Sequence, residues 1–101
     1  MSESTPSAAL PATVIIVNFN SGARLARCLD CLDRQTVVDF EVVVVDNASA
    51  DASLAEAGLA PEAAGRRNVR LIEAGRNAGF AAANNMATET ARGEWLAFLN
   101  P

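Results

Sequence analysis

The 101-residue sequence contains no histidine and only two cysteines. Without histidine, a complete Ser-His-Asp triad cannot be assembled from these residues. A zinc site needs four protein ligands, or three and a water, which two cysteines do not supply. Cys28 and Cys31 form a C-x-x-C pair, but Cys28 falls on the apolar stripe of a predicted helix, where a buried thiol behaves as a small hydrophobic side chain. We therefore expect both cysteines to be structural.

Positive charge is also scarce. All eight basic residues are arginines, against twelve acidic residues, so the net charge is −4 and the pI about 4.6. This balance does not favour nucleic-acid binding. No apolar run approaches the ~18 residues of a membrane span, and the start lacks the basic and apolar regions of a signal peptide. We expect residues 1–12 to be a flexible tail, residues 13–101 a single domain, and the protein to be cytoplasmic.

Short apolar runs alternate with helical patterns along the rest of the chain. The predicted strands cover residues 13–17, 40–45, 69–73 and 94–99. The predicted helices cover residues 23–34, 51–57 and 80–92, with Ser49 as a possible N-cap of the second and Gly93 ending the third. Residues 58–68 show no pattern and are interpreted as a loop. The order βαβαβαβ predicts an α/β fold with a Rossmann-like parallel sheet of strand order 3-2-1-4.

In that strand order a crevice opens at the carboxyl ends of the first and fourth strands. Residues 18–20 and Asn100 follow these strands, so we expect them to face each other across the crevice. The loop NFNSGARL has one glycine rather than the G-x-G-x-x-G of dinucleotide-binding domains. Neither a P-loop nor the G-x-S-x-G of a nucleophile elbow is present.

Polar residues follow the second strand and precede the third helix. Asp46 and Asn47 end an otherwise apolar strand, and a carboxylate there can accept hydrogen bonds from a base or a ribose. Capping of the next helix explains Asp46 equally well, and Asp51 is more simply explained by the helix dipole. In RNAGFAAANN, residues 76–85, a helix beginning at Gly79 would offer backbone N–H groups to a phosphate. The donors that we expect beside it are Arg76, Asn84 and Asn85.

Four segments, taken in order, resemble a known family. They are VIIVNFNSGARLARCLDCL, QTVVDFEVVVVDNASAD, NVRLIEAGRNAGFAAANN and ARGEWLAFLNP, which together cover residues 13–101 almost continuously. They resemble the N-terminal half of a GT-A-fold, family 2 glycosyltransferase, and within it the rhamnosyltransferase-like branch. The resemblance implies an inverting enzyme that transfers sugar from a UDP- or dTDP-sugar to a cell-surface polysaccharide or glycolipid, whose acceptor is membrane-linked.

The resemblance also implies roles for individual residues. The loop after the first strand would line the nucleotide base, and Asp46 would bind the base while Asp51 supports its loop. The segment after the third strand would lie beside the diphosphate. The implied nucleotide-binding residues are Val17, Asn18, Phe19, Asn20, Asp46, Asn47, Asp51, Asn77, Gly79, Asn84 and Asn85.

A divalent metal, Mg²⁺ or Mn²⁺, is implied at the end of the fourth strand. In the resembling branch the metal motif reads N-P-D, and this chain supplies Asn100 and Pro101, one residue short of the carboxylate. An amide oxygen is a poorer metal ligand than a carboxylate. We therefore expect a truncated donor-binding half, incompletely liganded at the metal, without a catalytic residue and inactive alone. Its uncovered fourth strand would favour self-association.

Two alternatives remain open. A non-catalytic nucleotide-binding or interaction module would have the same elements without the reaction. An unrelated α/β cofactor enzyme is disfavoured by the missing glycine fingerprint.

Overall fold

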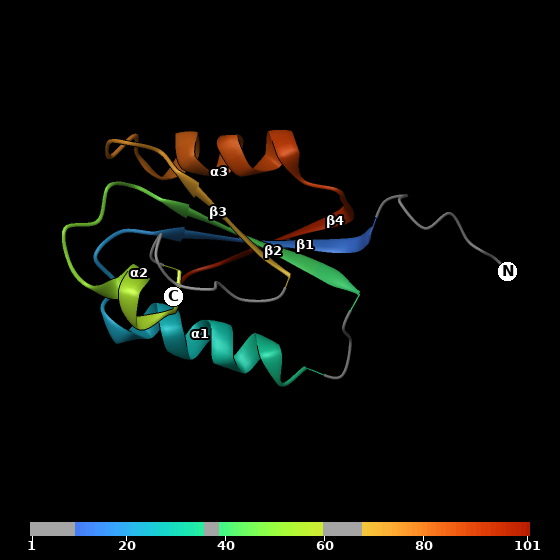
Figure 1. Ribbon diagram of the computed structural model, residues 1–101. Helices are drawn as coiled ribbons and strands as arrows, with labels where there is room; N and C mark the ends of the chain where they lie inside the picture. Colours follow the sequence, from blue (N-terminus) through green and yellow to red (C-terminus); the bar gives the residue numbers. More distant parts are fainter. Residues whose placement is uncertain (1–9, 36–38, 60–67) are drawn as a thin grey trace, which may run out of the picture.

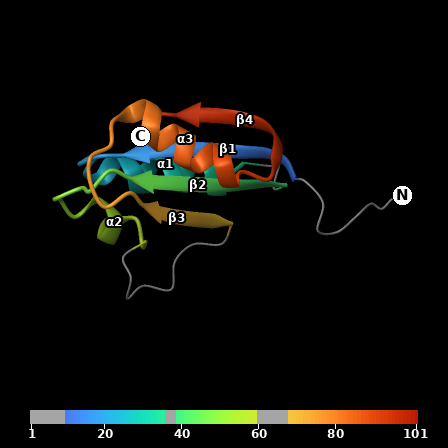
Figure 2. The same cartoon turned by 90° about the horizontal axis from the view of Figure 1, so that it is seen from above.

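The computed structural model describes residues 10–35, 39–59 and 68–101. Four parallel strands form one sheet in the order β3-β2-β1-β4, which confirms the predicted fold class (Figures 1 and 2). Helices α1 and α2 cover one face of the sheet, and α3 covers the other (Figure 1). The strands are β1 (Leu10–Asn18), β2 (Phe40–Asp46), β3 (Val69–Glu73) and β4 (Gly93–Leu99), and the helices are α1 (Ala23–Asp33), α2 (Ser53–Glu56) and α3 (Phe80–Thr90).

The two central strands carry the core. Side chains alternate between the faces of a strand, so each of β1 and β2 contributes to both layers of packing. On one face Ile16 and Val44 pack against Leu25 and Leu29 of α1. On the other face Ile15, Val17, Val43 and Val45 pack against Ala83 and Ala87 of α3. Burial of each such side chain contributes about 1.5–3 kcal/mol, which explains why these strands are apolar on both faces.

Several element boundaries differ from the predicted ones by one residue, and three differ by more. Strand β1 begins at Leu10 rather than at residue 13, because its first residues pair with Gly93 and Trp95 of β4. Helix α2 has only four residues, and α3 ends at Thr90 rather than at residue 92. Residues 1–9 of the predicted tail and 60–67 of the predicted loop lie outside the described residues.

Two residues have structural roles other than those predicted. Ser49 does not cap α2, whose N-cap position is occupied by Ala52 with no side-chain cap. Instead, the Ser49 hydroxyl donates to Asp46. Gly93 does not end α3 but begins β4, where an added Cβ would lie 2.3 Å from the backbone of Ala12 and Thr13. Close approach to β1 therefore explains this glycine.

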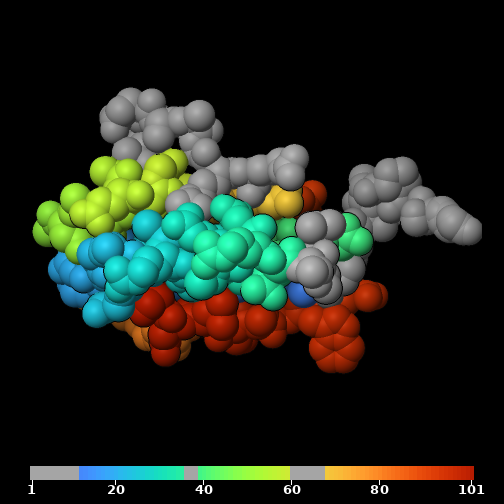
Figure 3. Space-filling model, turned by 90° about the horizontal axis from the view of Figure 1, so that it is seen from below, coloured from blue at the N-terminus to red at the C-terminus, as the bar shows by residue number. Residues whose placement is uncertain are grey.

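Strand β4 is one of the two edge strands of the sheet and is exposed along nearly its whole length. Trp95 and Phe98 are 73% and 52% exposed, and Leu96 and Leu99 are also open to solvent. By their register with β1, these side chains point to both faces of the sheet. In Figure 3 β4 lies uncovered beside α1. An apolar edge of this kind favours pairing with another chain, so self-association remains a prediction. Among the described residues, no helix has the length and hydropathy needed to cross a membrane.

Candidate functional site

The loops after β1 and β2 are joined by a buried polar cluster around Asn18. The Asn18 side chain is fully buried, and its Nδ2 lies 2.8 Å from Asp46 Oδ1, 2.9 Å from Ser53 Oγ and 3.1 Å from Ser49 Oγ. Two N–H groups are thus shared among three acceptors. The Ser21 hydroxyl donates to Asn18 Oδ1. Asn18 therefore faces the interior of the loops rather than the crevice, contrary to the arrangement we predicted.

Asp46 belongs to the same cluster. Its carboxylate is 4% exposed and accepts hydrogen bonds from the Ser49 hydroxyl at 2.7 Å and the Ser49 N–H at 3.0 Å, besides the bond from Asn18. These bonds hold the chain through Ala48, which has a φ of +61°, a conformation unusual for a residue with a Cβ. In this conformation the Asp46 carboxylate shapes its own loop.

A second set of contacts joins the same two loops nearer the surface. Asn20 Oδ1 accepts from the Ala50 N–H at 2.7 Å, and Asp51 Oδ2 accepts from the Gly22 N–H at 2.9 Å. Asp51 Oδ1 accepts from the hydroxyl and the N–H of Ser53. The bonds from Ser53, with the further bond from Gly22, hold the pKa of Asp51 below its ordinary value. Asn20 and Asp51 therefore fix the shape of the loops.

Asn47 connects the loop after β2 to the loop after β3. Its Oδ1 accepts from the Ala78 N–H and its Nδ2 donates to the Gly79 carbonyl, both at 3.3 Å. The Asn77 side chain accepts from the Gly79 N–H at 3.0 Å, at the start of α3. Gly79 has a φ of +89°, which favours glycine at this entry. Three loops therefore form one polar rim along the carboxyl edge of the sheet.

A pocket of about 290 Å³ opens inside this rim. It lies at the carboxyl ends of β1, β2 and β4, where open α/β sheets bind their ligands. Phe19 and Phe80, 47% and 56% exposed, provide its aromatic lining. The lining residues are Val17, Phe19, Ser21, Arg24, Asn47, Asn77, Phe80, Asn100 and Pro101. The predicted meeting of the first loop with Asn100 is thus present, through Phe19.

Other predicted residues lie outside the pocket lining. Asn18, Asn20, Asp46 and Asp51 form the loop contacts described above. On α3, Asn84 is half-buried with its carbonyl accepting from the Thr88 hydroxyl, and Asn85 is exposed. Gly79 does not line the pocket but forms hydrogen bonds with two residues that do, Asn47 and Asn77.

Sequence reasoning did not identify Arg24, which supplies the charged side chain of the pocket lining. It is the second residue of α1, where a cation opposes the helix dipole. This unfavourable placement, directly after the loop of the first strand, was the feature of the sequence that could have identified Arg24 as a site residue.

The residues that the structure describes do not form a divalent-metal site. No group of three or more His, Cys, Asp or Glu side chains in the described part of the chain is arranged to hold a metal ion. Asn100 contributes one amide to the pocket, and a divalent cation needs several oxygen ligands. Cys28 and Cys31 are free thiols; Cys28 packs against the core, and burial with the neighbouring Cys31 raises its pKa.

Curated proteins resemble this chain over most of its length. The succinoglycan biosynthesis protein ExoO of Rhizobium meliloti is 38% identical over 88 residues, which are 87% of this chain and 24% of that protein. A PGL/p-HBAD biosynthesis glycosyltransferase of Mycobacterium bovis is 38% identical over 87 residues, 86% of this chain and 33% of that protein. The chain thus spans at most about a third of the length of these two relatives.

A solved structure and a family description agree with these relatives. The mannosyltransferase PcManGT from Pyrobaculum calidifontis, solved in complex with GDP-Man and Mn²⁺, superposes with a TM-score of 0.76 at 29% identity. The match covers 94% of this chain and 28% of that one. Residues 13–101 match the description "Glycosyl transferase family 2". This chain therefore belongs to glycosyl transferase family 2.

Proposed function

We propose that this chain binds the donor, a nucleoside diphosphate sugar, for a glycosyltransferase of the rhamnosyltransferase-like branch. The observation that carries the proposal is the pocket at the carboxyl edge of the sheet, with aromatic, amide and cationic side chains. These are the groups that a base, a ribose and a diphosphate require. Membership of the family and the structural likeness to a protein bound to GDP-Man support it.

The pocket suggests a division of roles. The exposed ring of Phe19 offers a face on which a base can stack, and the exposed Asn77 amide of the same pocket can donate a hydrogen bond to a base or ribose. The buried Asn47 amide, already bonded to Ala78 and Gly79, holds the loop that carries Asn77. We assign the diphosphate to the Arg24 guanidinium, the cationic group of the same pocket lining. Asn18 and Asp46 act indirectly, by holding the loops that carry these groups.

The transfer itself is proposed only for a longer protein. Displacement at the anomeric carbon with inversion needs a base that deprotonates the acceptor hydroxyl, together with charge neutralisation at the diphosphate. The relatives are polysaccharide and PGL/p-HBAD biosynthesis proteins, so we propose a cell-surface polysaccharide or glycolipid acceptor, made at the inner face of the cytoplasmic membrane. We assign donor binding to this chain and expect it to be inactive in transfer alone.

The test is a titration of the isotope-labelled chain with UDP, dTDP and GDP, each with Mg²⁺ or Mn²⁺, followed by amide NMR. The expected result is saturable shifts at Phe19, Asn47 and the start of α1, strongest for the nucleotide of the natural donor. UDP or dTDP remains the prediction, and GDP tests the preference of the solved relative. The metal series shows whether Mn²⁺ or Mg²⁺ strengthens binding.

Arg24→Gln and Arg27→Gln provide the matched comparison. Both remove one charge from α1, but only Arg24 lines the pocket. Arg24→Gln is expected to weaken binding by about 10- to 100-fold, the loss of one or two charge-assisted hydrogen bonds, while Arg27→Gln leaves it nearly unchanged. Equal weakening by both variants would indicate nonspecific charge attraction. Absence of shifts at these residues with every nucleotide would refute the proposal and favour an interaction module.

A further inference from the structure

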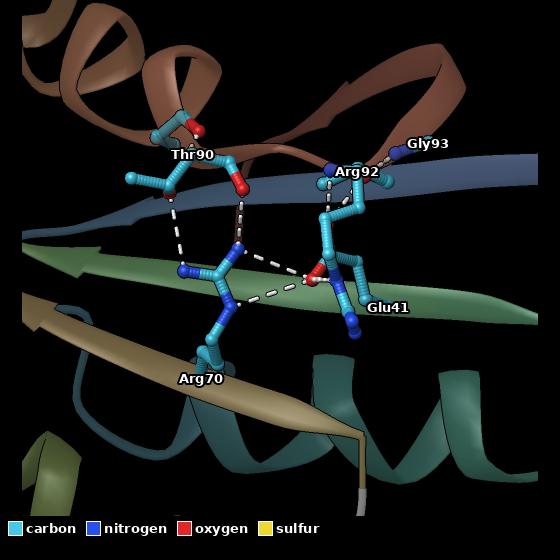
Figure 4. Close-up of polar contacts among 7 residues, drawn as sticks. Glu41, Arg70, Thr90, Arg92 and Gly93 are labelled. Atoms are coloured by element: carbon cyan, nitrogen blue, oxygen red, sulfur yellow. Dashed lines mark hydrogen bonds and ion pairs between the residues drawn. The ribbon is translucent and has the colours of Figure 1, made fainter. Parts of the chain in front are cut away.

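A buried carboxylate lies near the amino ends of the strands, at the opposite end of the sheet from the pocket. Glu41, the second residue of β2, is 4% exposed. Its Oε2 accepts from the Arg92 N–H at 2.7 Å and the Thr13 hydroxyl at 2.8 Å. Its Oε1 lies 3.1 Å from Arg70 Nη2 and 3.6 Å from Arg92 Nε (Figure 4). Both oxygens are thus fully engaged, as a buried charge requires.

These donors come from every neighbouring segment on this face. Thr13 belongs to β1, Arg70 to β3, and Arg92 to the connection between α3 and β4. Arg70 also donates to the carbonyl and the hydroxyl of Thr90, at the end of α3, as Figure 4 shows. Glu41 therefore links β2 to β1, to β3 and to the segment that joins α3 to β4.

The same cluster holds the first residue of β4. Thr13 donates its hydroxyl proton to Glu41, and its oxygen accepts from the Gly93 N–H at 2.8 Å. The adjacent Arg92 N–H bonds Glu41 directly. Two successive backbone N–H groups at the start of β4 are therefore fixed by side chains of β1 and β2 rather than by the ladder of the sheet.

Apart from the close approach of Gly93 to Ala12 and Thr13, little else specifies the register of β4. A strand with one buried face resists slipping, because a slip exposes its apolar residues. Strand β4 carries apolar side chains on both faces and is exposed along nearly its whole length. A slip of two residues would leave every side chain of β4 on the same face of the sheet, and it would move Asn100 by about 7 Å along β1. Asn100 and Pro101 would then leave the pocket that they line.

We propose that Glu41 is a positioning residue, a charged clamp that sets the register of β4 and thereby places Asn100 and Pro101 at the pocket. The clamp acts through the Arg92 and Gly93 N–H groups and not through any contact with the pocket itself. Only its consequence for nucleotide binding rests on the proposed function. The register can be measured without a ligand.

The test compares Glu41→Gln with Glu94→Gln by NMR of the whole 101-residue chain. Both variants remove one carboxylate, but Glu94 is exposed on β4 itself. In Glu41→Gln we expect the cross-strand β1–β4 contacts, such as Ile15 with Phe98, to be lost or shifted by two residues. Amide exchange in β4 should rise at least about tenfold, as for the loss of one charge-assisted hydrogen bond, while exchange in the β1–β2 pair rises less.

Glu94→Gln is expected to leave both readouts unchanged. Thr13→Val is the second variant, because it removes the bonds to Glu41 and Gly93 but retains the shape of the side chain and the charge of Glu41. It should loosen β4 selectively, as Glu41→Gln does. Unchanged β1–β4 contacts in Glu41→Gln would overturn the inference. A uniform rise in exchange over all four strands in both variants, or unfolding of both, would also overturn it, because it would show general stabilisation.

Discussion

The buried amide of Asn18 allows a quantitative test of the cluster that joins the two site loops. Asn18→Asp is nearly isosteric, but it places a second carboxyl oxygen where Nδ2 now lies, 2.8 Å from Asp46 Oδ1. Two carboxylates at this separation repel by about 6 kcal/mol at an effective dielectric constant of about 20. We therefore expect the pair to retain one proton in the folded state.

The cost of retaining that proton determines how much Asn18→Asp destabilises the fold at each pH. Protonating a carboxyl group whose pKa is about 3.9 in the unfolded chain costs about 5 kcal/mol at about pH 7.5 and about 2 kcal/mol at about pH 5.5. A pKa raised by folding stabilises the fold as pH falls. The free energy of unfolding of Asn18→Asp should therefore rise by about 1.4 kcal/mol for each pH unit of acidification in this interval.

Urea unfolding at several pH values between these limits measures the slope, with a stabilising osmolyte if the variant is partly unfolded at the higher pH. Asn18→Leu is the matched control, since it removes the same hydrogen bonds without adding a charge. Its loss of stability should not depend on pH. Equal, pH-independent losses in the two variants would refute the reasoning, because they would show that Asn18 and Asp46 are not in contact in solution.

Three further predictions concern the sheet. Gly93→Ala should destabilise the chain by about 1–3 kcal/mol in urea unfolding, since its Cβ would overlap the backbone of β1; a neutral effect would contradict the close approach. Burial by itself raises the pKa of Glu41, but bonds from Arg92, Thr13 and Arg70 outweigh it and lower the pKa. Stability should therefore decline below about pH 4.3, the range of an unperturbed glutamate, and Glu41→Gln should show a shallower decline in acid titration. Sedimentation should show a mass that rises with concentration and a lower mass for Phe98→Lys, whereas a constant monomeric mass would exclude association through β4.

The fold could be predicted because its signal is local and repeated. Each strand is an apolar run bounded by turn residues, and the alternation with helical patterns leaves few topologies. The start of β1 was missed because its first residues, with Pro11 among them, are poor strand formers that pair only because β4 lies alongside. Boundaries of this kind depend on a partner 83 residues away, as Leu10 on Gly93, and carry no signal of their own.

The site could be predicted only in outline. Strand ends identified which loops meet, but not which way their side chains turn. Asn18 and Asp46 point into the loops because Ala48 takes a left-handed conformation that brings Ser49 onto Asp46. That conformation is set by the tertiary contacts of the loop and not by the preference of alanine. Asn47, the residue after Asp46, does line the pocket, and its side chain turns toward the loop before α3.

The two buried polar pairs also explain how β1 and β2 find their register. Thr13 pairs with Glu41 at one end and Asn18 with Asp46 at the other, with four Val or Ile pairs between them. Those apolar pairs are nearly interchangeable, so a slip of two residues would change their packing little. It would, however, leave the polar groups at both ends buried against apolar neighbours, at about 1–3 kcal/mol for each and more for the carboxylates. The polar ends therefore specify the alignment on which both the pocket loops and the β4 clamp depend.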